Sequence, residues 1–206
     1  MRLPDRPLRV LGIDPGTHVC GWGVVAREGA RLVTLGFGAA RARAADPIER
    51  RLAAIAVALR EVVAAHAPDA AALEDVFYGR DVRAAVRIGE ARGAALLVLA
   101  EAGVPVTSYT NNVVKRAVAG GGRADKARVQ TMARAVLGLA NLGGPLDASD
   151  ALALAICHHH QAGAEALSGA AAVPGRRASR RGALSPRIAA AVEAMRVAER
   201  ARRRAP

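Results

Sequence analysis

Short apolar runs separated by turn residues predict strands in the first half of the chain. The first run ends at an Asp-Pro-Gly turn, and Gly29 separates the second run from the third, as in a hairpin. Because such short turns join antiparallel strands, we expect the first three strands to be antiparallel. The five predicted strands lie at residues 8–13, 21–26, 31–38, 70–76 and 105–109.

Apolar residues at intervals of three and four predict helices in much of the remaining chain. Asp46 has the residue type of an N-cap, and Pro47 and Glu49 follow it at favourable positions. The predicted helices lie at residues 46–67, 81–102, 113–119, 125–139 and 147–160. The second has small and apolar residues near one face, where another element can approach closely: Val82, Val86, Gly89, Gly93 and Leu97. The fourth is amphipathic, and its expected inner face holds Val129, Met132, Ala133, Val136 and Leu137.

The order of these elements predicts an α/β fold. Three antiparallel strands followed by strand–helix crossovers give a mixed five-stranded sheet, in which the later strands are parallel and helices flank both faces. We assign residues 1–161 to this domain. Residues 162–206 are rich in Ala, Arg, Gly and Ser, so we expect a mostly disordered basic tail there, with one basic helix at 186–204.

The chain is strongly basic, with a net charge of +12 and an isoelectric point of about 11.4. Residues 161–206 contain 10 Arg and 3 Glu, so the tail carries +7 and the rest of the chain +5. A charge of this sign favours a polyanionic partner, of which nucleic acid is the commonest. Because the body is basic as well, a basic tail on a neutral domain does not account for the charge.

Cysteine usage and hydropathy indicate a cytoplasmic protein. Cys20 and Cys157 are far apart and form no CxxC motif, which argues against a disulfide framework and against a zinc site. The first residues are polar and show no signal peptide. No apolar run approaches the roughly 18–20 residues that cross a membrane, so we expect no membrane association.

Four acidic residues are predicted to converge. Asp14 and Glu74 end the first and fourth strands, while Asp147 and Asp150 are three positions apart on one face of a helix start. Carboxylates gathered in a basic protein repel one another unless cations lie between them, and hard oxygen ligands suit Mg²⁺ or Mn²⁺. Two such ions about 4 Å apart promote phosphodiester hydrolysis. The pattern therefore predicts a metal-dependent nuclease with two Mg²⁺ ions, for which Mn²⁺ can substitute.

Each acid also has a structural interpretation. Asp147 is suited to cap its helix, with Asp150 in the favourable first turn, and Asp14 is suited to the turn that follows its strand. Glu74 is harder to explain in this way, because a charge in an apolar strand needs a partner. Asp75 is expected to face away from the site, since side chains alternate along a strand.

Five segments resemble the motifs of the RuvC-type crossover-junction endonucleases. They are LGIDPGT at 11–17 with GWG at 21–23, ALEDVF at 72–77, GEARG at 89–93, GRADK at 122–126 and DASDALA at 147–153. The resemblance covers about residues 8–161, in order and with compatible spacing. Two features depart from the family pattern: Trp22 stands where Tyr is more familiar, and the tail is longer. In some relatives a His takes the place of Asp147.

This resemblance implies an RNase H-like fold and a homodimer that nicks opposed strands of a four-way (Holliday) junction symmetrically, in recombination and DNA repair. It implies that Asp14, Glu74, Asp147 and Asp150 are the catalytic, metal-binding acids. It also implies that Phe77 acts at the opened junction centre and that Lys115 and Lys126, with Arg123 in the fourth motif, contact DNA. The branch-migration complex of RuvA and RuvB is the implied protein partner.

Some of these assignments have support in the residues themselves. Lys115 and Lys126 are the only lysines in a chain with 30 Lys and Arg, and they flank one Gly-rich loop, which favours a selected role over drift. Phe77 and Tyr78 follow the fourth strand, where an aromatic ring is suited either to stack on bases or to fill the core. The histidines at 158–160 suggest either a metal cluster or, better, a cover for the end of the last helix.

Two other functional classes remain as alternatives. GIDPGT at 12–17 also resembles the phosphate loop of actin/Hsp70-like ATP-binding domains, but the chain lacks a second lobe and further nucleotide motifs. A junction-binding architectural protein without chemistry is the other alternative, and the complete set of four acids argues against it. A metal-dependent nicking assay separates these classes.

Overall fold

The computed structural model describes residues 6–75, 82–122, 124–139 and 146–168, and at 82, 146–147 and 164–168 it describes the backbone alone. The chain divides into two compact units, Met1–Ala164 and Glu165–Pro206. The sheet belongs to the first unit. Most of the expected basic tail lies outside the described residues, so its disorder and the domain boundary at residue 161 stay predictions.

The first unit is built on a mixed five-stranded sheet. Its spatial order is β3-β2-β1-β4-β5, with β1, β2 and β3 antiparallel and with β4 and β5 parallel to β1. This arrangement confirms the predicted fold class. The strands are β1 (Arg9–Asp14), β2 (Val19–Glu28), β3 (Arg31–Arg41), β4 (Ala70–Glu74) and β5 (Val106–Tyr109).

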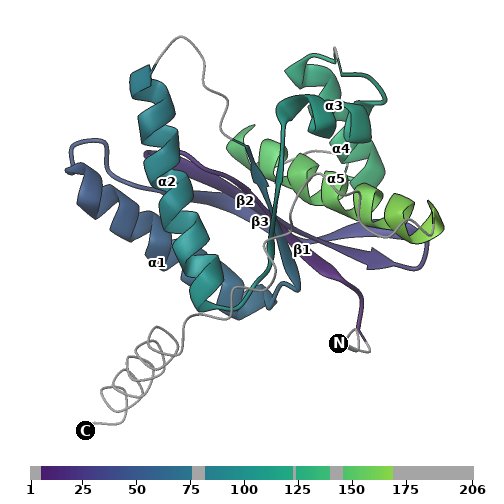
Figure 1. Ribbon diagram of the computed structural model, residues 1–206, viewed down its shortest axis with the longest axis horizontal. Helices are drawn as coiled ribbons and strands as arrows, with labels where there is room; N and C mark the ends of the chain where they lie inside the picture. Colours follow the sequence, from purple (N-terminus) through teal and green to yellow (C-terminus); the bar gives the residue numbers. More distant parts are fainter. Residues whose placement is uncertain (1–5, 76–81, 123, 140–145, 169–206) are drawn as a thin grey trace, which may run out of the picture. The chain divides into compact units, whose positions relative to one another are not determined.

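Helices cover both faces of this sheet. In Figure 1, α1 and α2 lie on one side of the strands and α3, α4 and α5 on the other. The helices are α1 (Ile48–His66), α2 (Val82–Glu101), α3 (Asn111–Ala119), α4 (Lys126–Leu137) and α5 (Leu146–Ser168). None of the described helices has both the length and the apolarity that a membrane span requires.

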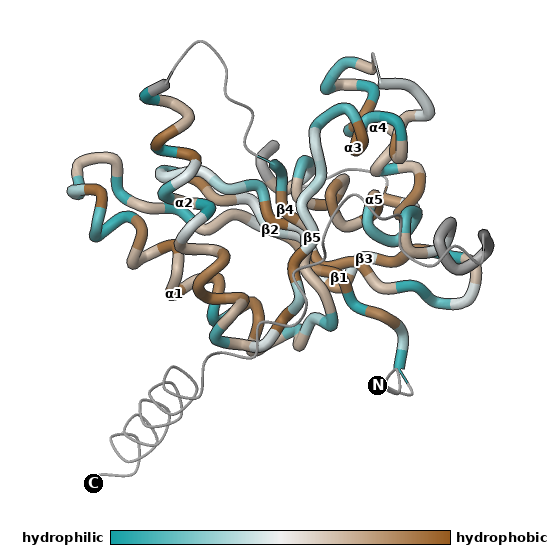
Figure 2. Tube along the Cα trace, in the orientation of Figure 1, coloured by the Kyte–Doolittle hydropathy of each residue, from teal (hydrophilic) through white to brown (hydrophobic). Residues whose placement is uncertain are grey.

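Side-chain alternation along the strands divides the core in two. Val10 of β1 packs with the α3–α5 layer, while its neighbours Leu11 and Ile13 pack with α1 and α2. The same alternation in β4 places Ala72 on the side of the α3–α5 layer and Leu73 on the side of α1 and α2. Figure 2 shows the apolar segments concentrated where the sheet meets the helices. This division decides which strand residues face the candidate site.

Three local predictions are wrong. The N-cap of α1 is Pro47 and not Asp46, and no side chain bonds the first turn there. Met132 of α4 is 36% exposed, because the buried face of α4 follows Val129, Ala133 and Leu137. Helix α5 begins at Leu146 and continues to Ser168, so it is longer than the predicted 147–160.

The small-residue face of α2 was expected to pack closely against another element, but it is not the face that is buried in this chain. The side of α2 that packs on the core holds Ala91, Ala95, Val98 and Leu99. The opposite side is apolar but open, with Val86 56% and Leu97 58% exposed. At Gly89 and Gly93 an added Cβ would meet nothing within 4 Å. No described element of this chain covers that stripe.

The two cysteines are free and buried, as the absence of a CxxC motif indicated. Burial raises the pKa of Cys20 to about 12 and that of Cys157 to about 11. Both thiols therefore stay protonated at neutral pH and serve as small apolar core groups.

Candidate active site

A cavity of about 350 Å³ brings most of the predicted site residues together. It opens where β1 and β4 end and where α3, α4 and α5 meet the sheet. Its wall is part polar and part apolar. The lining residues are Asp14, Glu74, Asn111, Val114, Lys115, Lys126, Val129, Asp150, Ala153 and Leu154.

Strand register places the first two acids side by side. The strands β1 and β4 are parallel neighbours in which Ile13 pairs with Leu73, so Asp14 and Glu74 follow at the same edge of the sheet. Both lie an even number of residues from side chains that face the α3–α5 layer, and so they point to that layer. The carboxyl ends of parallel strands therefore present two carboxylates to one cavity.

Gly12 brings the third acid to the same place. A Cβ added at Gly12 would lie 1.8 Å from the carbonyl oxygen of Ala151, so only glycine lets α5 rest directly on β1 at this point. Asp150 precedes Ala151 near the start of α5 and reaches the cavity. The apolar length of α5 that follows is fully packed, which holds Asp150 in place.

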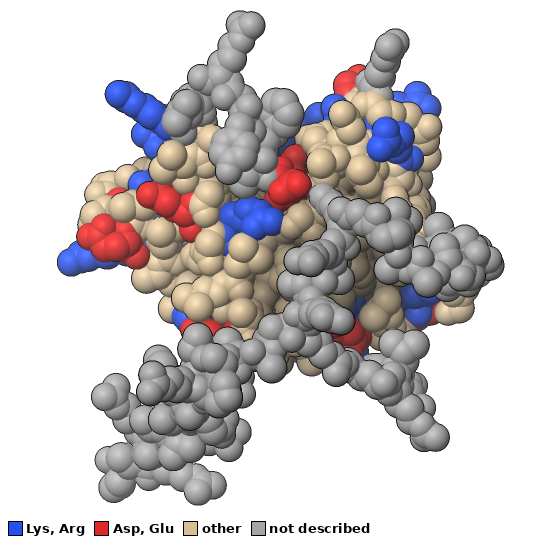
Figure 3. Space-filling model, in the orientation of Figure 1, with Lys and Arg blue, Asp and Glu red and all other residues tan. Residues whose placement is uncertain are grey.

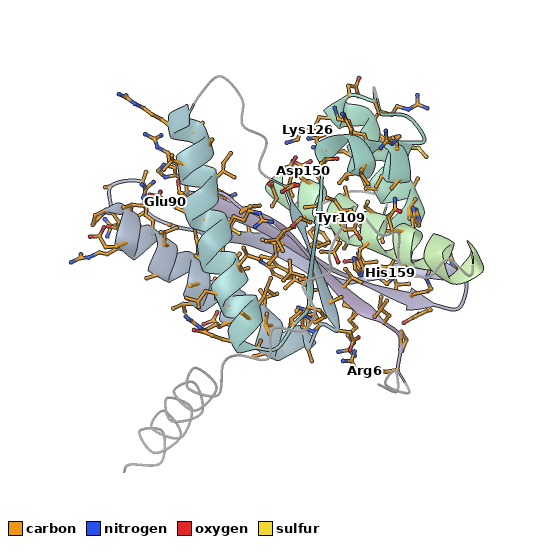
Figure 4. The ribbon with its side chains drawn as sticks, viewed as in Figure 1. Arg6, Glu90, Tyr109, Lys126, Asp150 and His159 are labelled. Atoms are coloured by element: carbon orange, nitrogen blue, oxygen red, sulfur yellow. The ribbon has the colours of Figure 1, made fainter. Side chains whose placement is uncertain are left out.

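A lysine lies against this acid. Lys126 Nζ is 2.5 Å from Asp150 Oδ2, and Figure 4 shows the two side chains reaching toward one another. Lys126 is the first residue of α4, whose start is fixed because the Asp125 side chain accepts a hydrogen bond from Arg128 N at 2.7 Å. Lys115 of α3 lines the same cavity. Two ammonium groups thus face three carboxylates.

Glu74 has both a side-chain and a backbone contact. Asn111 Nδ2 donates to Glu74 Oε1 at 3.1 Å, while Arg92 Nε donates to the Glu74 carbonyl at 3.3 Å and Arg92 Nη2 lies 2.5 Å from Ser108 Oγ. Burial raises the pKa of Glu74, and the nearby Asp150 carboxylate adds to that rise. The hydrogen bond from Asn111 and the two lysines act in the opposite direction.

The described donors do not converge on a single point. Among residues 6–75, 82–122, 124–139 and 146–168, no three His, Cys, Asp or Glu side chains stand close enough to hold one metal ion. Asp14, Glu74 and Asp150 instead stand around the wall of the cavity. Their chemistry still suits hard divalent cations, since all three offer carboxylate oxygens and none of the described residues that line the cavity offers sulfur or imidazole.

The remaining predicted residues fall into two groups. Asp147 belongs to α5 by its backbone, but its side chain is not described, and Phe77, Tyr78 and Arg123 lie outside the described residues. Asp75 is described and does not line the cavity, as strand alternation predicts. Sequence reasoning gave no role to Asn111 or to Arg92, although Arg92 lies in the GEARG motif at 89–93. The register of β4 against β5, which pairs Glu74 with Tyr109, is the signal that places Asn111 nearby.

The three consecutive histidines have a structural role instead of the two expected ones. They lie within α5 and do not end it, because the helix runs on to Ser168. His158 Nδ1 is 2.9 Å from the Tyr109 hydroxyl, His159 Nε2 is 3.0 Å from the Val25 carbonyl oxygen, and His160 Nδ1 is 2.9 Å from the Ala117 carbonyl oxygen. They join α5 to β5, β2 and α3. Covering a helix end is therefore a wrong prediction for them.

Basic residues are dispersed on the face drawn in Figure 3. The described Lys and Arg side chains there stand in separate groups with Asp and Glu between them, and they form no continuous stripe.

Comparison with known proteins assigns the chain to a family. Residues 10–158 match the family model described as "Crossover junction endodeoxyribonuclease RuvC". The protein of that name from Chloroflexus aggregans is 49% identical over 155 residues, which cover 75% of this chain and 94% of the relative. The one from Trichlorobacter lovleyi is 47% identical over 172 residues, covering 84% and 96%.

Solved structures agree with the sequence relatives. A structure described as T. thermophilus RuvC in complex with Holliday junction substrate has a TM-score of 0.71 and 38% identity, covering 75% of this chain and 94% of its own. The yeast mitochondrial Holliday junction resolvase Ydc2 has a TM-score of 0.55 at 11% identity, which shows a shared fold. With the family model matching most of its length, the chain belongs to the RuvC family of crossover junction endodeoxyribonucleases.

Proposed function

We propose that this protein resolves four-way DNA junctions by paired, symmetric, metal-dependent nicks in two opposed strands. The observation that carries the proposal is the cavity in which Asp14, Glu74 and Asp150 face Lys115 and Lys126. Carboxylates bind cations and lysines bind phosphate, so the two kinds of group together suit a phosphodiester and its metal. The solved relative described with a Holliday junction substrate supports the choice of DNA substrate.

Asp14, Glu74 and Asp150 are the residues that would hold Mg²⁺, with Asp147 as the fourth acid of the motif. We propose two ions per active site, because two divalent ions about 4 Å apart promote phosphodiester hydrolysis. When bound, divalent ions lower the pKa of water and stabilise charge on the leaving oxygen. Mn²⁺ has similar ligand preferences and is expected to substitute.

The other side chains of the cavity orient the DNA. Lys126 and Lys115 each offer a compact point charge to the phosphate backbone. Val114, Val129 and Leu154 form an apolar part of the same wall beside these charges. Lys126 exchanges its contact with Asp150 for one with phosphate when DNA enters.

Cutting two equivalent strands requires two active sites, so we propose a homodimer. The open apolar stripe of α2, formed by Val86, Gly89, Gly93 and Leu97, is the surface that fits this role. Exposed apolar side chains gain from burial, and glycines without neighbours let a second helix approach closely. The α2 helix also contacts the site, because Arg92 donates to the Glu74 carbonyl.

The remaining assignments rest on the family motifs. We propose that Phe77 stacks on bases at the junction centre, that Arg123 contacts DNA, and that the tail adds phosphate attraction. Association with the RuvA–RuvB complex rests on the same ground.

A synthetic four-way junction with each strand labelled in turn tests the proposal. We expect nicks at symmetric positions in two opposed strands with Mg²⁺ or Mn²⁺, none with EDTA, and none in linear duplex of the same sequence. Binding of the junction without nicking would favour an architectural protein. Saturable binding of ATP in place of junction cleavage would favour the ATP-binding alternative.

A further inference from the structure

Asn111 occupies a position from which it controls one of the site acids. It is the first residue of α3, two residues after Tyr109, which is the register partner of Glu74. Its side-chain Nδ2 donates to Glu74 Oε1 at 3.1 Å, and both side chains line the cavity. The path of the chain from β5 into α3 thus places an amide over the end of β4.

The chemistry of this contact leaves Glu74 available to a cation. A carboxylate oxygen accepts more than one partner, and an amide NH₂ on Oε1 leaves Oε2 and a further lone pair of Oε1 open. The amide is neutral, so it does not compete with a cation as an ammonium does. Asp150 differs in this respect, because Lys126 Nζ is 2.5 Å from its Oδ2.

Holding the Glu74 carboxylate in one orientation also lowers the entropic cost of binding a metal ion. A free glutamate side chain has several rotamers, and a metal ion that selects one of them pays for that ordering. The amide orients the carboxylate before the ion arrives, and the Arg92 contact with the Glu74 carbonyl fixes the backbone of the same residue. Side chains that orient metal ligands typically raise metal affinity about 10- to 100-fold.

We propose that Asn111 is a positioning residue that presents the Glu74 carboxylate to the metal, a role that rests on the proposed metal-dependent function. It acts through Glu74 and not on DNA directly. Its loss therefore weakens the binding of the ion more than it slows the reaction at saturating metal.

A neighbouring asparagine provides the matched control. Asn112 is the next residue of α3, is also exposed, and does not line the cavity. The variants Asn111→Ala and Asn111→Leu remove the donor with and without loss of volume, and Asn112→Ala changes the same residue type one position away. Because both asparagines are exposed, all three variants are expected to melt within about 2 °C of the wild type.

The test measures metal binding directly as well as activity. Calorimetric titration of each full-length protein with Mn²⁺, without DNA, gives the affinity, and junction nicking across a range of Mg²⁺ gives the half-saturating concentration and the rate at saturation. We expect both Asn111 variants to bind metal about fivefold or more weakly, with a saturating rate within about twofold of wild type. Asn112→Ala should match the wild type in both.

Two results would overturn the inference. Asn111 variants with wild-type metal affinity would show that the amide does not position a ligand, and an equal loss in Asn112→Ala would show a general effect on α3. Failure of the proposed function has a different signature, because the wild-type protein itself would then bind no Mn²⁺ and nick no junction.

Discussion

Lys126 and Asp150 form an ion pair inside the candidate active site, with Nζ and Oδ2 2.5 Å apart. The pair joins the start of α4 to the start of α5, and the two residues come from separate family motifs. Their side chains are 63% and 29% exposed, so the contact is open to solvent and to DNA. An exposed pair of this kind stabilises the fold little and exchanges partners readily, as a site that binds both cations and phosphate requires.

Neutralising the acids should separate binding from chemistry. Asp14→Asn, Glu74→Gln, Asp147→Asn and Asp150→Asn keep the shape of each side chain and remove the charge that holds metal. We expect each to slow junction nicking about 100-fold or more, while junction binding persists in a gel-shift assay because phosphate repulsion falls. Asp75→Asn is the control and should keep substantial activity. If it abolishes nicking while Glu74→Gln does not, the second acid is misassigned.

Removing the charge of Lys126 should affect both binding and rate. In Lys126→Met we expect about tenfold slower nicking and a salt dependence of junction binding that is shallower by about one unit of slope. Arg128→Met removes an equal charge from the same turn of α4, outside the cavity. Arg128→Met should make the salt dependence of junction binding shallower without slowing nicking. An equal loss of nicking rate in the two variants would contradict the assignment of Lys126.

A charge on the open face of α2 should prevent dimer formation. Leu97 is 58% exposed on that face and Val57 is 53% exposed on α1, so Leu97→Glu and Val57→Glu are matched changes at two surfaces. Light scattering at micromolar concentration should give a monomer mass for Leu97→Glu and a dimer mass for Val57→Glu. Leu97→Glu should also lose paired nicking. A dimer that tolerates Glu at position 97 would place the interface elsewhere.

His159 should make the fold sensitive to acid. Burial lowers its pKa from 6.5 to about 4, because the charged ring would lose its hydration. A pKa depressed in the folded state means that the unfolded chain takes up the proton first, so stability is full above pH 6.5 and falls as the pH drops toward 4. The shift corresponds to a loss of about 3 kcal/mol between about pH 7 and pH 4.

The variant His159→Gln isolates this contribution, since its amide can still donate to the Val25 carbonyl that His159 contacts at 3.0 Å. Urea unfolding at several pH values should show a shallower acid loss in His159→Gln than in the wild type. His18→Gln changes an exposed histidine and is the control. Profiles that are parallel for His159→Gln and the wild type would refute the role of His159.

Adding a methyl group at Gly12 should displace α5. The new Cβ would lie 1.8 Å from the Ala151 carbonyl oxygen, and neither backbone moves without separating β1 from α5. We expect Gly12→Ala to lose about 1–3 kcal/mol of stability, or more, and to slow nicking because Asp150 moves with Ala151. Gly163→Ala lies later in α5 where the added Cβ meets nothing within 4 Å, and it should melt at or above the wild-type temperature. Equal melting of both variants would show that the close contact is not required.

The sequence alone determined the elements and their order, because hydrophobic periodicity is a local property. Apolar runs and turn residues located all five strands, and the hairpin around Gly29 indicated their antiparallel start. The same pattern placed Asp14 and Glu74 at strand ends, where the structure has them. Local patterns failed where a choice depended on distant neighbours, as at Met132, which has an apolar side chain at helical spacing and yet is 36% exposed.

Only the tertiary structure decided which groups face one another in the site. The contact of Asn111 with Glu74 depends on the pairing of β4 with β5, and the ion pair of Lys126 with Asp150 depends on how α4 and α5 meet. Gly12 is one residue of a predicted strand in the LGIDPGT motif, but its function in packing is set by Ala151, far along the chain. These relationships join residues that are distant in sequence, so they arise only when burial of both faces of the sheet brings the helices onto the strands.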